Sequence, residues 1–449
     1  MDERKERHQD GEMRVACCTL GCKVNQYESQ TVLDRFAENG YRVVDFSDLA
    51  DVYIINTCTV TQIAARKSRQ MIHRARKLNP NAVIAAMGCY IDKGERQILE
   101  GVVDVAVGNR DKMNLLSLVE DCQRQRGLRV PGTPDASETR GGIRQGPSRG
   151  GQTRAFLKVQ DGCRQYCSYC IIPFVRGPLA SKEPRQAVAE ARGFVDAGYK
   201  EIVLTGIHLS SYGKDLEKPS SLAELIGLLG QLEGLRRIRL GSLEPRMITP
   251  SFLEAVSGTD TLCPHFHLSL QSGSAVTLSQ MNRKYTPDEY RKAVGLLRAT
   301  YADAAITTDV IVGFPGETEA EFVASAEFVK SVGFAHVHVF KYSRMEGTKA
   351  AARPDQIPEE EKRRRVEEML RVTDECSRLY LTKYIGAVRD VLMEEYHVDG
   401  KYWEGYTDNY IKVRVPAEDG KDRRNQLLRV RLESMDARQH DYYMWGVTV

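Results

Sequence analysis

Short apolar segments alternate with amphipathic helical segments over most of the chain up to Lys349, and this alternation restricts the fold to the α/β class. In residues 12–130 the expected strands are Val15–Thr19, Val52–Asn56, Ala82–Met87 and Val102–Val107. Helical patterns at Gln26–Asn39 and Ile63–Leu78 lie between them. Such alternation is typical of a parallel sheet covered by helices. We therefore predict an open parallel α/β sheet for this first unit.

The middle of the chain contains six further strand candidates with helical patterns between them. These strands are expected at Phe156–Val159, Ile202–Thr205, Ile238–Leu240, Phe266–Leu270, Thr308–Val312 and His336–Phe340. The helices are expected at Pro184–Asp196, Leu222–Gln231, Pro287–Ala299 and Glu319–Ser331. Successive βα units predict a partial (β/α)6 barrel, in which chemistry takes place at the carboxyl ends of the strands. With a long helix expected from Pro358 to Tyr384, this unit spans residues 154–384.

Two other segments lack this alternation. Residues 131–153 are rich in Pro, Gly and Ser, which predicts a linker. It is either a solvated tether or an arm that contacts RNA phosphates through its arginines, namely Arg140, Arg144, Arg149 and Arg154. Residues 385–449 contain short strand-like runs such as Ile411–Val415 and Leu427–Leu432, which predict a small β-barrel.

The cysteine count indicates the cellular compartment of the protein. There are 11 cysteines, an odd number, and the polar segment Met1–Glu12 has no secretory pattern. These features argue against a disulfide framework and predict a reducing, cytoplasmic location. No segment approaches the roughly 20 apolar residues of a membrane helix, so we expect no membrane partner. The net charge of +3 is too small to indicate nucleic-acid binding by itself.

Three cysteines form a CxxxCxxC motif directly after the first strand of the predicted barrel, at Cys163, Cys167 and Cys170. Three soft thiolates on one short loop favour zinc or an iron–sulfur cluster. Structural zinc normally has four protein ligands, and no fourth Cys or His lies near this loop in the sequence. Three ligands on a 4Fe-4S cluster would leave one iron open to a small molecule.

This loop resembles the radical SAM signature CxxxCxΦC, in which Φ is aromatic and here is Tyr169. The resemblance implies that the open iron chelates S-adenosylmethionine (SAM) and that the reduced cluster cleaves it to a 5′-deoxyadenosyl radical. It also implies contacts to SAM or substrate at the strand ends that contain Gly206, Glu244, Gln271 and Asp309. Ordinary turn chemistry is the alternative for each of these strand ends.

Three other cysteines, Cys22, Cys58 and Cys89, each follow a predicted strand of the first unit. Because the carboxyl ends of parallel strands gather along one edge, we expect the three thiols to converge there as a metal site. Gly21 and Gly88 would let the backbone approach a bulky ligand. Buried core cysteines are the alternative. We interpret the five remaining cysteines as structural, namely Cys17, Cys18, Cys122, Cys263 and Cys376.

The run LGCKVNQYES at residues 20–29 resembles the opening motif of the methylthiotransferase family. NTCTV around Cys58 and GCY around Cys89 match its next two motifs. The resemblance covers nearly the whole chain. It implies that Cys22, Cys58 and Cys89 hold a second 4Fe-4S cluster, whose open iron carries the sulfur that is transferred. Two departures are Ala180, where an arginine is common, and Ile91-Asp92, where Ala-Gln is common.

From this resemblance we expect a radical SAM enzyme that adds a methylthio group at C2 of N6-threonylcarbamoyladenosine-37 in tRNA. The implied partners are the tRNA anticodon stem-loop, an electron donor of the flavodoxin or ferredoxin type, and a sulfur donor. The C-terminal unit resembles the RNA-binding TRAM domain. Isopentenyladenosine-37 and a ribosomal-protein aspartate are alternative substrates. An alternative from another functional class is that the chain is not an enzyme but a zinc-containing, non-catalytic RNA-binding protein.

Two polar groupings have two interpretations each. The helix Ile63–Leu78 has a basic face that either is solvated or contacts phosphates, formed by Arg66, Arg69, Arg76 and Lys77. His336 and His338 alternate with apolar residues on one strand, which favours packing or substrate contact over metal ligation.

Overall fold

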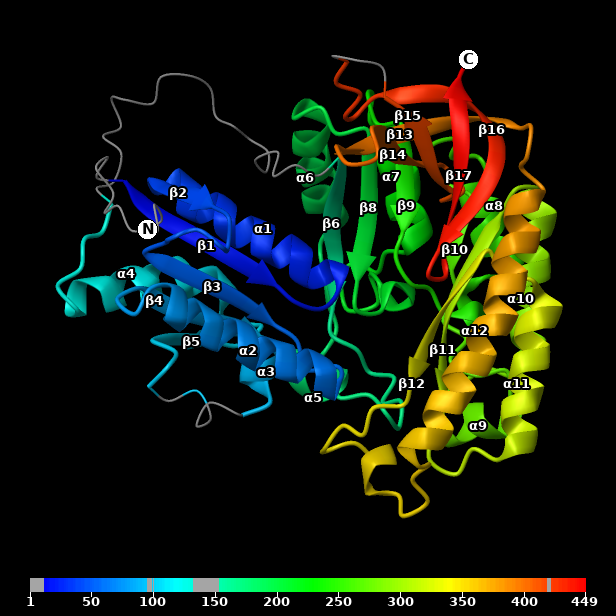
Figure 1. Ribbon diagram of the computed structural model, residues 1–449, viewed down its shortest axis with the longest axis horizontal. Helices are drawn as coiled ribbons and strands as arrows, with labels where there is room; N and C mark the ends of the chain where they lie inside the picture. Colours follow the sequence, from blue (N-terminus) through cyan, green and yellow to red (C-terminus); the bar gives the residue numbers. More distant parts are fainter. Residues whose placement is uncertain (1–11, 95–98, 100, 132–152, 418–420) are drawn as a thin grey trace.

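The structure, a computed structural model, describes residues 12–94, 99, 101–131, 153–417 and 421–449. Three packed units follow one another along the chain (Figure 1). The expected linker, with Arg140, Arg144 and Arg149, lies outside the described residues except at its two ends. No helix of the described part is long and apolar enough to span a membrane.

The first unit is a parallel sheet of five strands in the order β2-β1-β3-β4-β5. Its strands are β1 (Met13–Thr19), β2 (Tyr41–Val44), β3 (Val52–Thr57), β4 (Val83–Gly88) and β5 (Val105–Val107). Every residue of β3 and β4 is buried, as expected for central strands covered on both faces. The predicted open parallel sheet is therefore confirmed, with the edge strand β2 added to it.

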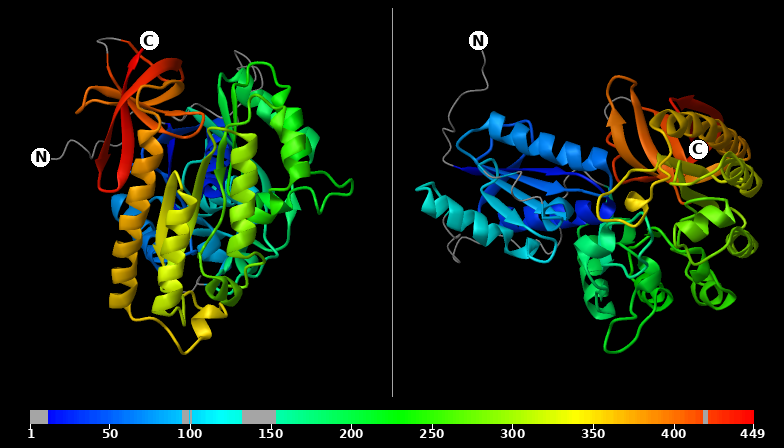
Figure 2. Two further views of the ribbon diagram at one scale, coloured as in Figure 1. Left: turned by 90° about the vertical axis from the view of Figure 1, so that its right-hand side faces the viewer. Right: turned by 90° about the horizontal axis from the view of Figure 1, so that it is seen from below.

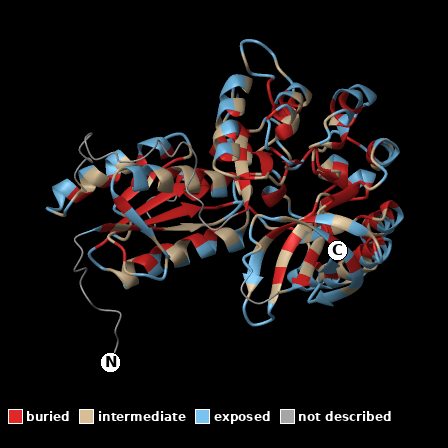
Figure 3. Cartoon of the chain, turned by 90° about the horizontal axis from the view of Figure 1, so that it is seen from above, coloured by how far each residue is buried: buried red, intermediate tan, exposed pale blue. Residues whose placement is uncertain are grey.

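Helices cover both faces of this sheet. They are α1 (Lys23–Glu38), α2 (Gln62–Leu78), α3 (Cys89–Asp92), the 3-10 turn η3 (Lys112–Asn114) and α4 (Leu115–Gln125). Phe36 of α1 and Val119 of α4 pack on one face. Ile72 of α2 and Tyr90 of α3 pack on the other. The sheet thus has two hydrophobic cores, and its strands are buried between them (Figure 3).

The central unit is the predicted partial barrel. Its parallel strands are β6 (Arg154–Asp161), β8 (Glu201–Gly206), β9 (Arg237–Leu240), β10 (His265–His267), β11 (Ala305–Val312) and β12 (His336–Lys341). The short strand β7 (Ala180–Ser181) pairs antiparallel with β6. Bridges between Ile238 and Leu262 and between Leu243 and Leu268 connect the β6-β8-β9 part to the β10-β11-β12 part.

Helices surround these strands. They are α5 (Ile172–Arg176), α6 (Pro184–Asp196), α7 (Leu222–Gly230), α8 (Pro250–Ser257), α9 (Ala275–Gln280), α10 (Pro287–Thr300), α11 (Glu319–Val332) and α12 (Glu359–Thr382). Three 3-10 turns follow strands or loops, namely η4 (Leu209–Ser211), η5 (Pro245–Met247) and η6 (Ala350–Ala352). Helices α10 and α11 begin with capping boxes at Thr286 and Thr318, which satisfy the first free backbone N–H groups.

The third unit is a closed β-barrel with the strand order β13-β14-β15-β17-β16. Its strands are β13 (Val388–His397), β14 (Tyr402–Thr407), β15 (Lys412–Pro416), β16 (Leu427–Arg438) and β17 (Asp441–Thr448). Alternate residues of each strand, including Met393, Trp403 and Val413, fill the interior. The predicted small β-barrel is confirmed.

The arrangement of the three units places the carboxyl edge of the parallel sheet against the open side of the partial barrel. The carboxyl ends of β1 and β3 point toward the open side of the partial barrel (Figure 1), and helix α1 contacts β6 and β8. The C-terminal barrel lies at the amino ends of β6, β8 and β9 (Figures 1 and 2). The carboxyl ends of the barrel strands are therefore left open at the opposite side.

Candidate functional site

The loop after β6 contains the first three cysteines. Gly162 begins this loop at a φ of +71°, and an added Cβ would lie 1.8 Å from the carbonyl oxygen of Pro178, so only glycine fits. The thiols of Cys163, Cys167 and Cys170 are all half-buried. The backbone N–H of Cys170 donates to the carbonyl of Cys167 at 3.0 Å, which closes a tight turn.

Charge interactions show that these three thiols are neighbours. Burial, together with the nearby Cys167 and Cys163 thiols, raises the pKa of the Cys170 thiol to about 12. The guanidinium of Arg283 donates from Nη1 to the Sγ of Cys167 at 3.2 Å. A buried cation beside three thiols favours their thiolate form, which is the form that binds metal.

The second set of cysteines lies at the carboxyl edge of the parallel sheet. Cys22 precedes α1, Cys58 follows β3 and Cys89 begins α3. Burial raises the pKa of the Cys58 thiol to about 11, and Cys89 and Cys22 both contribute to the rise because they are close to it. The structure therefore brings together three residues that are far apart in the sequence.

Two glycines make this approach possible. Gly21 and Gly88 have φ values of +102° and +104°, which strain any residue with a side chain. A Cβ at Gly21 would lie 3.0 Å from the Sγ of Cys58. A Cβ at Gly88 would lie 2.7 Å from the carbonyl oxygen of Thr57. Both glycines therefore allow a close approach of the loops that contain Cys22, Cys58 and Cys89, and their approach to a bulky ligand stays a prediction.

Side-chain amides fix the loops around the second set. Asn25 donates from Nδ2 to the carbonyls of Leu20 and Thr57, at 2.7 and 3.2 Å, and so ties the Cys22 loop to the Cys58 loop. Asn109 donates to the Sγ of Cys89 at 3.5 Å and to the carboxylate of Asp92 at 2.6 Å. Asp92, one of the two departures noted in the sequence, therefore orients a neighbour of Cys89.

The spacing of the thiols bears on which metal they could hold. Among the described residues, one group alone brings three potential ligand atoms within 4.8 Å of one another, and it contains no cysteine. Three thiolates on a single tetrahedral zinc, by contrast, lie roughly 3.8 Å apart for Zn–S bonds of about 2.3 Å. Neither thiol set meets that 4.8 Å criterion within the described part of the chain, and each offers three protein ligands, the number that a 4Fe-4S cluster with one open iron takes.

A buried carboxylate connects the two cysteine-bearing units. Glu28 of α1 pairs with Lys112 of its own unit, with Lys158 at 2.7 Å and with Arg176 at 3.0 Å. Arg176 also donates to Asn25 at 2.6 Å. Burial opposes the charge on Glu28, yet Lys112, Arg176 and Lys158 together hold the pKa of its carboxyl well below the ordinary value of 4.5.

This charge network contains functional residues that the sequence analysis missed. Glu28 and Asn25 lie three residues apart, on one face of the helix that starts at Cys22, and this spacing was the available signal. Their partners Lys158 and Arg176 come from the other unit, so no local pattern could identify them. The network holds the two thiol sets in one rigid block.

The predicted barrel residues occupy different surroundings. Glu244 has its carboxylate 3.3 Å from Arg283 and 3.5 Å from His208. Burial opposes its charge, but the His208 ring and the Arg283 guanidinium lower the pKa of its carboxyl below the ordinary value. Gly206 packs against Gln160, where a Cβ would lie 3.0 Å from the glutamine side chain. Tyr169 packs with Ile311 in a small apolar cluster next to Cys167.

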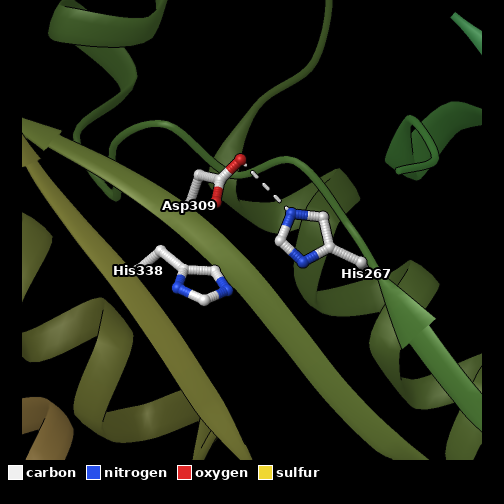
Figure 4. A group of neighbouring side chains, drawn as sticks. All are labelled: His267, Asp309 and His338. Carbon is white, nitrogen blue, oxygen red and sulfur yellow. Dashed lines mark ion pairs between the residues drawn. The ribbon is translucent and has the colours of Figure 1, made fainter. Parts of the chain in front are cut away.

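Gln271 and Asp309 lie deeper in the barrel. Gln271 adopts a positive φ of 70° and donates its backbone N–H to the carbonyl of Asp309 at 2.8 Å. The Asp309 carboxylate is 3.3 Å from Nε2 of His267, and His338 completes the group (Figure 4). The sequence analysis had considered His338 and Asp309 separately, and the structure places them on neighbouring strands in register.

Buried arginines attach the C-terminal barrel. Arg239, fully buried, pairs with Glu201 at 2.7 Å and donates to the carbonyls of Thr407 and Asp408. Arg154 pairs with Glu394 at 2.7 Å and is buried against Tyr410. Neither interpretation of the linker arginines, a solvated tether or an arm that contacts RNA, describes Arg154, because its side chain fixes the third unit.

The basic face of α2 differs from the predicted one. Arg76 pairs with Asp104 at 2.7 Å and donates to the carbonyls of Pro80 and Ala82, so it fastens the helix to the sheet. A hollow of about 480 Å³ is instead lined by Arg66, Arg69, Gln70, His73, Arg74 and Lys77. We call the side chains of Arg66, Arg69, His73, Arg74 and Lys77 the basic face of α2.

Comparison with protein families gives two matches. Residues 14–108 match a family described as "Uncharacterized protein family UPF0004". Residues 157–329 match the radical SAM superfamily. The first range contains Cys22, Cys58 and Cys89, and the second contains the CxxxCxxC loop.

Curated relatives cover most of the chain. A threonylcarbamoyladenosine tRNA methylthiotransferase of Bacillus subtilis is 40% identical over 89% of this chain and 89% of its own. Its namesake in Aquifex aeolicus is 36% identical over 90% of this chain and 96% of its own. A tRNA-2-methylthio-N(6)-dimethylallyladenosine synthase of Thermoanaerobacter pseudethanolicus is 32% identical over 84% of this chain and 81% of its own.

Among solved structures, a radical S-adenosylmethionine methyltransferase from Kitasatospora setae with a bound [4Fe-4S] cluster is similar in fold. The TM-score is 0.54 at 14% identity, over 76% of this chain and 77% of the other. This similarity concerns the fold alone, and it agrees with the α/β class and the barrel described above.

Proposed function

This chain belongs to the radical SAM family of tRNA methylthiotransferases, and from that premise we propose that it adds a methylthio group at C2 of N6-threonylcarbamoyladenosine in tRNA. The observation that carries the proposal is the joining of two three-thiol sets into one block by the Glu28 network. The greater identity to threonylcarbamoyladenosine enzymes than to the dimethylallyladenosine synthase supports this choice of substrate.

We assign one 4Fe-4S cluster to Cys163, Cys167 and Cys170 and a second to Cys22, Cys58 and Cys89. When bound, the first cluster and SAM supply the radical that makes a C2–H position reactive, and the second supplies the sulfur. Each set offers three cysteines, whereas structural zinc normally has four protein ligands, and this disfavours the zinc-containing, non-catalytic alternative.

The protein's own residues position these groups. Arg283 keeps a positive charge beside Cys167 and orients Glu244, which faces the open end of the barrel. Tyr169 supports the cysteine loop from the apolar side. We place SAM along the strand ends at Gly206 and Glu244, and the substrate nucleotide on the side that faces Cys22.

Each of the three units would have its own role in the reaction. Residues 12–130 hold the second cluster, residues 154–384 cleave SAM, and residues 385–449 bind RNA as a TRAM-like barrel. The anticodon stem-loop would also contact the basic face of α2. A reducing protein of the flavodoxin or ferredoxin type would supply electrons, and a separate donor would replace the transferred sulfur.

The test combines nucleoside mass spectrometry with purified variants. In a strain that lacks the protein, the methylthio form of threonylcarbamoyladenosine should disappear from tRNA, and the wild-type gene should restore it. Cys167→Ala should abolish both SAM cleavage and methylthiolation. Cys58→Ala should abolish methylthiolation and keep SAM cleavage, because it alters the other thiol set.

Cys122→Ala is the matched control, since Cys122 lies on α4 away from both sets. It should behave as the wild type. An unchanged nucleoside profile in the deletion strain, or SAM cleavage by Cys167→Ala at the wild-type rate, would refute the assignment.

A further inference from the structure

A polar group inside the partial barrel belongs to neither cysteine set. It consists of His267 of β10, Asp309 of β11 and His338 of β12, whose side chains point toward one another from three adjacent strands (Figure 4). One nitrogen of each imidazole and one carboxylate oxygen lie within 4.8 Å of one another. His338 is exposed and the other two are half-buried, so solvent reaches the group. Two imidazoles and a carboxylate are a common ligand set for divalent transition metals.

Strand register brings the three side chains together. Asp309 pairs directly with His338 across β11 and β12, and Thr307 pairs with His267 across β10 and β11. Thr307 and Asp309 are two residues apart, so they project from the same face of β11. The sequence interpretation of His338 as a packing or substrate contact considered its own strand alone. The register gives it two partners with ligand atoms.

The distance between His267 and Asp309 fits two ligands of one metal better than a direct hydrogen bond. Nε2 of His267 is 3.3 Å from the Asp309 carboxylate. A charge-assisted N–H···O bond is normally about 2.7–2.9 Å long. Two ligands on a tetrahedral zinc, with bonds of about 2.0–2.1 Å, lie roughly 3.3–3.4 Å apart. His338 is the exposed member of the group, so its side chain has room to close the remaining distance to the other two.

A threonine hydroxyl fixes the His267 ring through its other nitrogen. Oγ1 of Thr307 is 3.0 Å from Nδ1 of His267 and 3.2 Å from Nε2 of His265, and both Thr307 and His265 are buried. A hydroxyl can accept from one ring and donate to the other. When it accepts from Nδ1 of His267 and donates to His265, the Nε2 atom next to Asp309 keeps its lone pair for a metal. Metal-bound histidines are normally held in this way.

We propose that His267, Asp309 and His338 form a binding site for one divalent transition metal of the Zn²⁺ type, with Thr307 as the positioning residue of His267. Three protein ligands on a tetrahedral metal leave one position open. In this group the open position is accessible to water or to an oxygen atom of a molecule bound in the barrel. None of the ligands is a cysteine, so the site is separate from both thiol sets and does not rest on the proposed function.

The test uses the full-length protein after anaerobic iron–sulfur reconstitution, so that the cysteines are occupied. The protein is dialysed against chelator-buffered Zn²⁺, and zinc and iron per chain are measured by elemental mass spectrometry. We expect stoichiometric zinc in addition to about eight irons, the number that two 4Fe-4S clusters contain. X-ray absorption at the zinc edge should show nitrogen and oxygen ligands at about 2.0–2.1 Å and no sulfur at about 2.3 Å.

Substitution of the ligands should remove this zinc and leave the iron in place. Loss of an outer hydrogen bond typically lowers metal affinity about tenfold to a hundredfold, and loss of a ligand lowers it further. His338→Gln and Asp309→Asn should therefore each weaken zinc binding by more than about a hundredfold. The double variant His267→Gln, His338→Gln should bind no zinc.

Two further variants distinguish a metal site from a general change in structure. Thr307→Val keeps the size of the side chain and should lower zinc affinity about tenfold to a hundredfold, whereas Thr307→Ser should restore it. His440→Asn is the matched control and should keep the wild-type zinc content. His440 also pairs with a carboxylate, that of Asp374 at 2.7 Å, but the described residues offer this surface pair no third ligand.

Each outcome decides for or against the site. The wild-type zinc content and absorption spectrum decide even if a variant fails to fold, which a loss of its iron would reveal. Wild-type protein without stoichiometric zinc, a sulfur ligand on the zinc, or full zinc binding by the double variant would overturn the proposal. The nucleoside profile of the deletion strain does not depend on these results, so the proposed function is tested separately.

Discussion

A single guanidinium, that of Arg283, contacts both the thiol of Cys167 and the carboxylate of Glu244. Its Nη2 is 3.3 Å from Glu244 without hydrogen-bond geometry, so the bond to sulfur is the more directional contact. Such a charge-assisted bond contributes about 1.5–3 kcal/mol. At the scale of the residue, Arg283 is thus the group on which the electrostatics of the first thiol set depends.

We expect Arg283→Met to lower SAM cleavage at least tenfold, because Cys167 loses the cationic donor to its sulfur and the thiolates bind iron less tightly. Arg283→Lys should retain most of the activity. The measurements are iron per chain after reconstitution and the yield of 5′-deoxyadenosine. Arg291→Met, on the outer side of α10 and paired with Asp288, should match the wild type. Full iron loading and normal cleavage in Arg283→Met would contradict this role.

At the scale of the element, helix α2 has a basic face without an acidic residue. Its N-cap Thr61 accepts from the backbone N–H of Ala64, and Arg76 fastens its last turn to the sheet. Arg69 is half-buried and donates to the hydroxyl of Tyr90 at 3.1 Å, whereas Arg66, Arg74 and Lys77 are exposed. A rigid row of cations next to Cys58 fits the spaced phosphates of an RNA strand.

We expect the triple variant Arg66→Ala, Arg74→Ala, Lys77→Ala to weaken tRNA binding and to reduce its salt dependence. Each lost phosphate contact should lower the slope of log affinity against log salt by about 0.7–0.9. Affinity measured at several salt concentrations gives this slope. The control is Arg363→Ala, Arg371→Ala, Arg378→Ala, three exposed arginines of α12. An equal loss of tRNA affinity in both triple variants would mean that the net charge, and not this face, determines binding.

At the scale of the whole molecule, the Glu28 network joins two units that each have a hydrophobic core of their own. One carboxylate pairs with three cations. Asp161 also pairs with Lys158 and Arg176, so removing Glu28 leaves the buried Lys112 without an ion-pair partner among the described residues. Breaking a buried pair in this way costs about 3–5 kcal/mol. The relative placement of the two thiol sets therefore depends on one side chain far from either sulfur site.

We expect Glu28→Gln to lower the unfolding temperature and to flatten the acid side of the stability profile. The folded-state pKa of Glu28 is held well below its ordinary value of 4.5. Its contribution is therefore fully present above about pH 4.5 and is lost as the pH falls below it. Thermal unfolding between pH 3 and pH 7 measures the effect. The surface variant Glu319→Gln should retain the wild-type profile. If the unfolding temperature of Glu28→Gln changed with pH in the same way as that of the wild type, Glu28 would not have this role.

Much of the fold could be predicted because its signals are local. The runs at β3 and β4 are continuously apolar, as in central parallel strands, and the cysteines that follow them must share an edge. Strand β2 was missed because it is a short edge strand with two exposed residues, so its apolar pattern is weak.

The parts that could not be predicted involve long side chains that reach across units. Helical spacing placed Arg76 on the outer face, but its guanidinium turns back to Asp104 on a neighbouring segment. Arg154 looked like part of a linker and instead starts β6 and pairs with Glu394, 240 residues away. The pairing of Asp309 with His267 likewise depends on strand register, which the sequence does not specify.

Helix α1 begins at the second thiol set and pairs with the barrel through Glu28, six residues after Cys22. Each residue of an α-helix advances the side-chain direction by about 100°. A one-residue insertion or deletion between Cys22 and Glu28 would therefore turn the carboxylate away from Lys158 and Arg176, although every amino acid of the motif survived. The relative position of the two thiol sets therefore depends more on the number of residues in this interval than on their identity.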